Sequence, residues 1–179
     1  MAIRRITFAS LILLLSAFTI SVVSAAVYYA LLGDMTYQAK LSPVVFTSGS
    51  DTSVCGGSLS TNSTIATFTN IPLAVESQIT ITQLVNVTNS DSTGHSVQVS
   101  VGSENFGSEL SMLRLYLVSP AGTETLVVEL DTTGAVTTQG VSVSIPAGQE
   151  YAMKLVGYYD SGTLGSQTNT MTLNLQVTG

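Results

Sequence analysis

The chain has 179 residues, of which 45% are hydrophobic and only 9% are charged, so it is long enough for one packed domain and too apolar for a disordered chain. Arg4 and Arg5 lie in the N-terminal segment, which leaves 5 − 2 = 3 basic residues against 11 acidic ones, a net charge of 3 − 11 = −8. A surface of that sign repels phosphate backbones and argues against nucleic-acid binding. The single cysteine, Cys55, excludes an intramolecular disulfide, and we expect it to be a small buried hydrophobe.

Residues 1–25 have the layout of a secretory signal. Arg4 and Arg5 give it a positive start, residues 6–23 form an almost unbroken apolar run, and Val23-Ser24-Ala25 fits the last positions before a peptidase cut. The positive end stays on the cytoplasmic face while the apolar run crosses, so the rest of the chain is expected outside the cell.

Cleavage is expected after Ala25, with a cut after Ala26 as the second choice. The alternative is an uncleaved membrane anchor, because the apolar run is near the ~18 residues that can span a bilayer. Tyr28 and Tyr29, which follow it, would suit the membrane interface in that case. In both cases, contact with the membrane is expected only through this segment.

After Asp34 the hydrophobic pattern changes to a period of two, in which apolar residues alternate with Ser, Thr and Gln between short turn segments. This alternation is typical of half-buried strands, and no helical three-to-four spacing recurs beyond Leu32. One β domain is therefore expected over residues 40–179. Its predicted strands cover residues 37–46, 64–70, 79–88, 96–102, 110–118, 124–130, 141–145, 151–158 and 171–177.

Turns and alternation indicate how these strands are arranged. Residues 119–122 and 146–149 each place Pro early and Gly late, which suits tight reversals. Residues 141–145 alternate between apolar side chains and serine, and residues 113–117 do the same with Arg114 and Tyr116 outward. The sequence predicts an all-β fold, an antiparallel β-sandwich of the jelly-roll or Ig-like kind.

The residues that usually carry catalysis are sparse. His95, the only histidine, follows a Ser-Thr-Gly turn at the start of a strand and is interpreted as a turn residue. No G-x-S-x-G nucleophile motif accompanies it, and one His with one Cys is too few for a zinc site.

The acidic residues are interpreted as scattered surface groups. Glu104 and Glu109 flank a Gly-containing loop, Asp51 lies in another loop, and Asn89-Ser90-Asp91 is the nearest fragment to a calcium loop. Hydrolysis by two carboxylates is left open by this pattern but is not required by it. We expect no enzyme activity, no cofactor and no metal.

Two N-glycosylation sequons are present, at Asn62 and at Asn86. In an exported chain both are candidate acceptors. Asn62, which falls in a predicted loop, is the better candidate.

The order of parts in this chain resembles a known family. Residues 26–29 follow the predicted cleavage site, residues 42–46 lead into the Gly-Ser-Asp of residues 49–51, and Cys-Gly-Gly follows at residues 55–57. Over most of its length the layout resembles that of the archaeal bundling pilins and thread-filament subunits, which are similar to the TasA and camelysin family.

This resemblance implies an extracellular filament of identical subunits, assembled head to tail by donor-strand exchange. Residues 26–39 would leave their own domain after cleavage and complete a sheet in the next copy. The residues that would fill a groove there are Val27, Tyr29, Leu31 and Met35.

Three other functions stay open at this point. The first is a membrane-anchored monomeric adhesin or envelope protein. The second is a type IV pilin-like subunit, for which Arg4-Arg5-Ile6 lacks the Gly or Ala before the cut and the Glu after it. The third is a secreted carbohydrate-binding or hydrolytic sandwich, for which neither an aromatic platform nor paired acids are evident.

Overall fold

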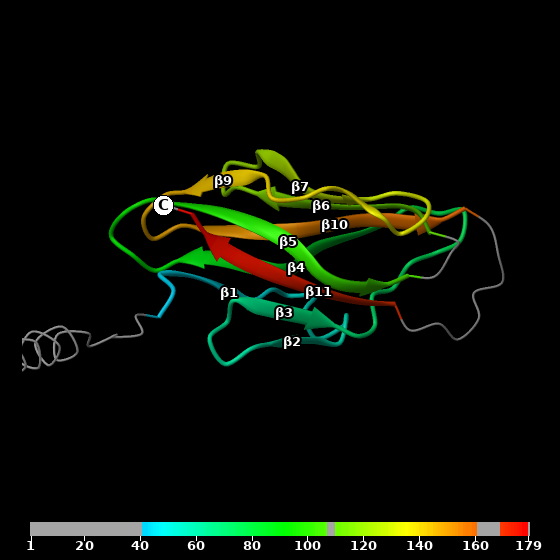
Figure 1. Cartoon of the computed structure of the whole chain (residues 1–179), viewed down its shortest axis with the longest axis horizontal. Coiled ribbons are helices and arrows are strands. Elements are labelled where there is room, and N and C mark those ends of the chain that lie inside the picture. The colour runs from blue at the N-terminus through cyan, green and yellow to red at the C-terminus, as the bar shows by residue number, and fades with distance from the viewer. Residues whose placement is uncertain (1–40, 107–109, 161–168, 179) are drawn as a thin grey trace, which may run out of the picture. The chain divides into compact units, whose positions relative to one another are not determined.

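The computed structural model describes residues 41–106, 110–160 and 169–178. Within these ranges the chain forms β-strands and no helix (Figure 1). The strands are β1 (Val44–Ser48), β2 (Gly57–Leu59), β3 (Ile65–Phe68), β4 (Ile79–Asn89), β5 (His95–Asn105), β6 (Leu110–Val118), β7 (Glu124–Leu130), β8 (Val136–Thr138), β9 (Ser142–Ile145), β10 (Glu150–Tyr159) and β11 (Thr170–Val177).

The strands form two antiparallel sheets. Sheet A has the order β1-β4-β10-β6-β7-β8, and sheet B has the order β2-β3-β11-β5-β9. The two sheets pack face to face, so the predicted all-β sandwich is confirmed. The C-terminal strand β11 lies inside sheet B between β3 and β5, and pairs with both of them (Figure 1).

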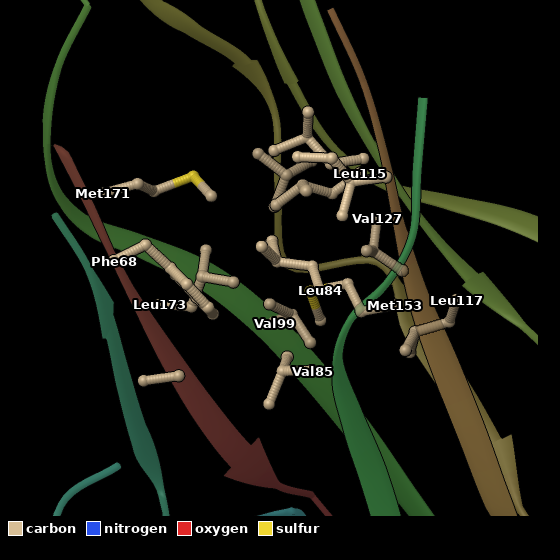
Figure 2. Close-up of a cluster of buried hydrophobic side chains, with 14 of the residues drawn as sticks. Phe68, Leu84, Val85, Val99, Leu115, Leu117, Val127, Met153, Met171 and Leu173 are labelled. Carbon is tan, nitrogen blue, oxygen red and sulfur yellow. The ribbon is translucent and has the colours of Figure 1, made fainter. Parts of the chain in front are cut away.

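The core lies between the sheets and is filled by the inward side chains of alternating strands. Leu115 and Leu117 of β6 are buried, as are Val99 of β5 and Leu173 of β11 (Figure 2). Each such side chain stabilises the fold by roughly 1.5–3 kcal/mol relative to an exposed one. Cys55 is 1% exposed in the same cluster, which confirms it as a buried hydrophobe.

Nine strands were predicted and all nine are present, but the first one was placed wrongly. Strands β6 and β7 have the predicted bounds. The first strand was predicted over residues 37–46, but residues 41–43, the first described part of that range, are not strand, and β1 begins at Val44. There the Ser42 Oγ donates to the Val44 carbonyl at 2.6 Å and Pro43 has no N–H, so a ladder cannot continue. The three-residue strands β2 and β8 were missed.

The two outer faces of the sandwich differ in charge. The strands of sheet A carry Arg114, Lys154 and the acids Glu124, Glu129 and Glu150. The alternation and register of sheet B instead turn uncharged residues outward, a set that we call the uncharged face: Ser58, Ile65, Thr67, Ser96, Gln98, Ser100, Ser142, Ser144, Thr172, Asn174 and Gln176.

Candidate functional site at the entrance end of the domain

The chain enters the described domain at one end of the sandwich. Leu41, the first described residue, exposes 78% of its surface, so it does not pack against the domain. Two residues later the chain is fixed, because the Ser90 N–H donates to the Pro43 carbonyl at 2.9 Å. We call this end, formed by residues 41–43, the β4–β5 turn and the β9–β10 turn, the entrance end.

Asn89 joins these segments. Its side chain is fully buried, and its Nδ2 donates to the carbonyls of Thr93 at 2.8 Å, Ile145 at 3.0 Å and Pro146 at 3.1 Å. Its Oδ1 accepts the N–H of Asp91 at 2.9 Å. Because Ile145 and Pro146 lie more than fifty residues away in the chain, one amide holds two turns together.

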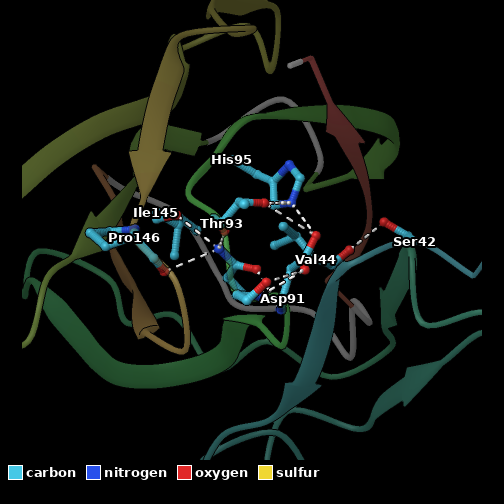
Figure 3. A network of polar contacts seen from close by, with 9 residues as sticks. Ser42, Val44, Asp91, Thr93, His95, Ile145 and Pro146 are labelled. Atoms are coloured by element: carbon cyan, nitrogen blue, oxygen red, sulfur yellow. Dashed lines mark hydrogen bonds and ion pairs between the residues drawn. The ribbon is translucent and has the colours of Figure 1, made fainter.

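Next to Asn89, a polar network lies inside the β4–β5 turn (Figure 3). The Asp91 Oδ2 is 2.9 Å from the Nε2 of His95, and the Thr93 Oγ1 is 3.3 Å from that same nitrogen. The hydrogen bond from His95, followed by the backbone N–H of Ser92, lowers the pKa of Asp91 to about 2. The carboxylate therefore stays ionised through the usual working range of pH.

This network lacks the geometry of a catalytic triad, although it contains a hydroxyl, an imidazole and a carboxylate. In a triad, the carboxylate binds one imidazole nitrogen and the nucleophile binds the other, so that a proton can be taken up. Here Asp91 and Thr93 both face the Nε2 of His95. The predicted role of His95 as a turn residue at the start of a strand agrees with this arrangement.

Of the other acids considered above, the two that are described, Asp51 and Glu104, do not pair with each other. The Asp51 Oδ2 accepts the N–H of Gln83 at 3.1 Å, and Glu104 is exposed at the end of β5, whereas Glu109 lies outside the described residues. Among the described residues, no three His, Cys, Asp or Glu side chains gather closely enough to hold a metal ion. Asn89 and Asp91, the calcium-like fragment, instead serve the turn.

The described cations are both paired on the outer face of sheet A. The Arg114 Nε lies 2.7 Å from Glu129, which raises the pKa of the guanidinium, and the Lys154 Nζ lies 2.6 Å from Glu124. The Lys154 Nζ also lies 5.3 Å from the centre of the Tyr116 ring. These pairs leave no free positive charge to recruit an anion on this face of the described domain.

The two sequons differ in accessibility. Asn62 is exposed in the loop between β2 and β3. Asn86 is 9% exposed inside β4, and its Nδ2 donates to the Glu150 carboxylate at 2.9 Å. A glycan on Asn86 would break that bond and does not fit the folded sheet, so Asn62 is the acceptor that the fold leaves open.

The edge of β4 that faces β1 is only partly covered by that strand. Strand β1 pairs with Val85 to Asn89 of β4, and within the described ranges no strand pairs with Ile79 to Thr82 on that side. Beyond β1, the loop of residues 49–56 contacts β4 at Thr82, Gln83 and Leu84: the Asp51 N–H donates to the Gln83 carbonyl, the Asp51 carboxylate accepts from Thr82 and Gln83, and the Thr52 hydroxyl donates to the Leu84 carbonyl. The open stretch lies at the end of β4 opposite to the entrance end.

The outer edge of β1, in contrast, is already occupied. The Phe46 N–H donates to the Ser63 carbonyl at 2.6 Å, and Ser42 occupies the Val44 carbonyl. In the described domain, the large hydrophobic side chains that are exposed are those of Leu41, Val54 and Ile65.

No protein-family model matches the chain, and no curated protein matches it. No helix in residues 41–106, 110–160 and 169–178 is long and apolar enough to cross a bilayer. The predicted cleavage positions Ala25 and Ala26 lie outside the described residues, as do the predicted strand residues Val27, Tyr29, Leu31 and Met35.

Proposed function

We propose that this protein is the structural subunit of an extracellular filament, in which residues 26–39 of one copy add as a strand to the open stretch of β4 in the next. The observation that carries this proposal is the edge of Ile79 to Thr82, with which no described strand pairs, at the opposite end of β4 from the place where the chain enters the described domain. An unpaired edge is a ready template for a strand from another chain.

The positions of donor and acceptor favour a head-to-tail arrangement. Copies stacked end to end would bring the entrance end of one domain, from which Leu41 projects, to the open edge of the next. Such a contact does not close on itself and so extends into a fibre. The open stretch of four residues is about 13 Å long, which the alternating residues Val27, Tyr29 and Leu31 span.

Backbone pairing alone would not hold two copies together. About four hydrogen bonds would contribute roughly 2–6 kcal/mol, whereas the association of two copies costs about 4–15 kcal/mol. The donor side chains must therefore be buried, and the three apolar ones that span the stretch would contribute roughly 5–9 kcal/mol. Val54, 66% exposed, lies in the loop that contacts Thr82 and Gln83, and offers an apolar partner beside the edge.

The test uses the protein secreted by cells. We expect the mature chain to begin at Ala26 or Val27 and to form fibres in electron micrographs. Deletion of residues 26–37 is expected to abolish the fibres while the circular dichroism of the folded domain persists. Secreted monomers that retain Met1 would contradict the proposal, and so would fibres formed by the deletion variant.

The acceptor edge is tested separately by Thr80→Pro. Thr80 has an exposed side chain on the open stretch, and alternation along β4 directs its N–H away from β10. Proline at this position removes an edge donor, and its ring blocks an incoming strand. We expect folded protein without fibres, whereas the matched Thr80→Val variant forms them. Fibres of normal length from Thr80→Pro would place the acceptor elsewhere.

A further inference from the structure

A polar hollow lies on the outer face of sheet A, where β6 and β10 meet the β7–β8 turn. It has a volume of about 420 Å³ and opens to solvent. The ion pair of Arg114 and Glu129 is part of its lining, together with Asp131 and Tyr158. Sites for small molecules have volumes of about 300–1,000 Å³, so this space, which we call the sheet A hollow, is large enough for a ligand.

Two irregularities in strand pairing lie at the hollow. The pairing of β6 with β10 skips Ser111, and the pairing of β8 with β7 skips Thr137. A residue that is skipped in this way forms a β-bulge, which bends the strand and re-aims a side chain. Both residues line the hollow, and the Thr137 hydroxyl donates to the Glu129 carbonyl at 3.2 Å. The bulges therefore add hydroxyl groups to the charged side chains of this site.

The charged side chains of the hollow are held in place and keep some of their bonding capacity. Arg114 donates from Nε to the Glu129 Oε1 at 2.7 Å, which leaves its terminal amino groups as donors. The Asp131 Oδ1 accepts the hydroxyl and the N–H of Thr133 at 2.7 and 2.8 Å and the N–H of Ala135 at 3.1 Å. The bonds from Thr133 lower the pKa of Asp131, so its carboxyl is ionised. Within the described ranges, no hydrogen bond reaches the second carboxylate oxygen of Glu129 or of Asp131, and both can accept from a ligand.

This lining suits a neutral ligand that has several hydroxyl groups. One guanidinium faces two carboxylates, so the hollow has a net negative charge and repels an anionic ligand. Hydroxyl groups of a ligand can donate to the carboxylates and accept from the guanidinium. Tyr158 is half-buried and lies opposite Met112 in the sheet, and both line the hollow. They offer an apolar surface for the C–H face of a sugar ring.

We propose that the sheet A hollow binds a neutral sugar unit of a polysaccharide. Glu129 and Asp131 accept from its hydroxyl groups, and Arg114 donates to them. Tyr158 packs against the ring. One sugar ring in an open site is expected to bind with a dissociation constant of about a millimolar, and a polysaccharide with repeated units can engage several copies of the domain. This site goes beyond the filament and does not depend on it.

The test uses the mature secreted protein on an array of neutral and anionic glycans, with hits titrated by calorimetry. We expect binding to a neutral glycan, and a loss of about tenfold or more in Tyr158→Ala, whereas Tyr158→Phe, which keeps the ring, binds as wild type. The matched control is Tyr116→Ala, at an outward tyrosine of the same face that does not line the hollow.

A second variant keeps the test valid if Tyr158→Ala does not fold, as judged by circular dichroism. Glu129→Gln keeps the shape of the side chain but replaces a carboxylate oxygen by a donor, so it should weaken binding by about tenfold as well. Binding of a neutral glycan should also be unchanged when the salt concentration rises from about 0.05 to about 0.5 M, because no net charge is paired.

Four results would overturn the proposal. They are the absence of binding to every neutral glycan, wild-type binding by folded Tyr158→Ala or by folded Glu129→Gln, binding only to anionic glycans, and binding only to polylysine, which would indicate a basic peptide as the ligand. Fibres that bind no glycan would overturn this proposal and leave the filament intact. Glycan binding by a protein that forms no fibres would contradict the filament alone.

Discussion

Truncation of Asn89 removes few atoms but should lower the free energy of unfolding of this domain markedly. Asn89→Ala deletes the donor to the carbonyls of Thr93, Ile145 and Pro146 and the acceptor for the N–H of Asp91. A buried polar group left unpaired costs about 1–3 kcal/mol. Only the bond to Ile145 is fully buried, and the others can regain water, so we expect a loss of about 2–4 kcal/mol.

The assay is urea unfolding followed by circular dichroism. An unchanged slope of the free energy of unfolding against urea concentration would show that the variants still unfold in two states. Asn89→Asp keeps an acceptor for Asp91 but sets a carboxylate against three carbonyls, so it should be at least as destabilising as Ala. Thr132→Ala, at an exposed turn residue, should change stability by less than about 0.5 kcal/mol. If Asn89→Ala is as stable as the Thr132 control, the entrance end is not held by this amide.

Two further predictions concern the turn and the glycan. The pKa of Asp91 is lowered from 3.8 to about 2 in the folded domain, so its contribution to stability is present above pH 3.8 and is lost as the pH falls towards 2. Acid titration of the unfolding midpoint should show this loss in the wild type and a flatter profile in Asp91→Asn. Mass spectrometry of the secreted protein should find a glycan removed by Asn62→Gln and unchanged by Asn86→Gln, and a glycan on Asn86 would show that modification precedes folding.

The strands could be predicted where alternation was long. Strand β6 alternates from Met112 to Val118 and was placed at its observed bounds. Strand β8 has three residues, too few for a period of two to stand out, and it pairs only at the rim of sheet A. Such short edge strands depend on a neighbour that the local sequence does not contain.

The entrance end was not recognised from sequence, for a related reason. Asn89-Ser90-Asp91 has the composition of any polar turn, and the fragment was weighed only as a calcium loop. The carbonyls that fix the role of Asn89 belong to Ile145 and Pro146, which no spacing rule connects to it. The outward residues of sheet B followed from alternation, but their union into one uncharged face required the register of five strands.

The place of β11 has a consequence for how the chain folds. This last strand separates β3 from β5, and the Thr172 hydroxyl lies 3.4 Å from that of Thr67, 105 residues earlier. Sheet B therefore cannot be completed until the C-terminal residues have been made, and its pairings are of the long-range kind that form slowly. A chain that ends early would therefore lose the middle of a sheet instead of a tail.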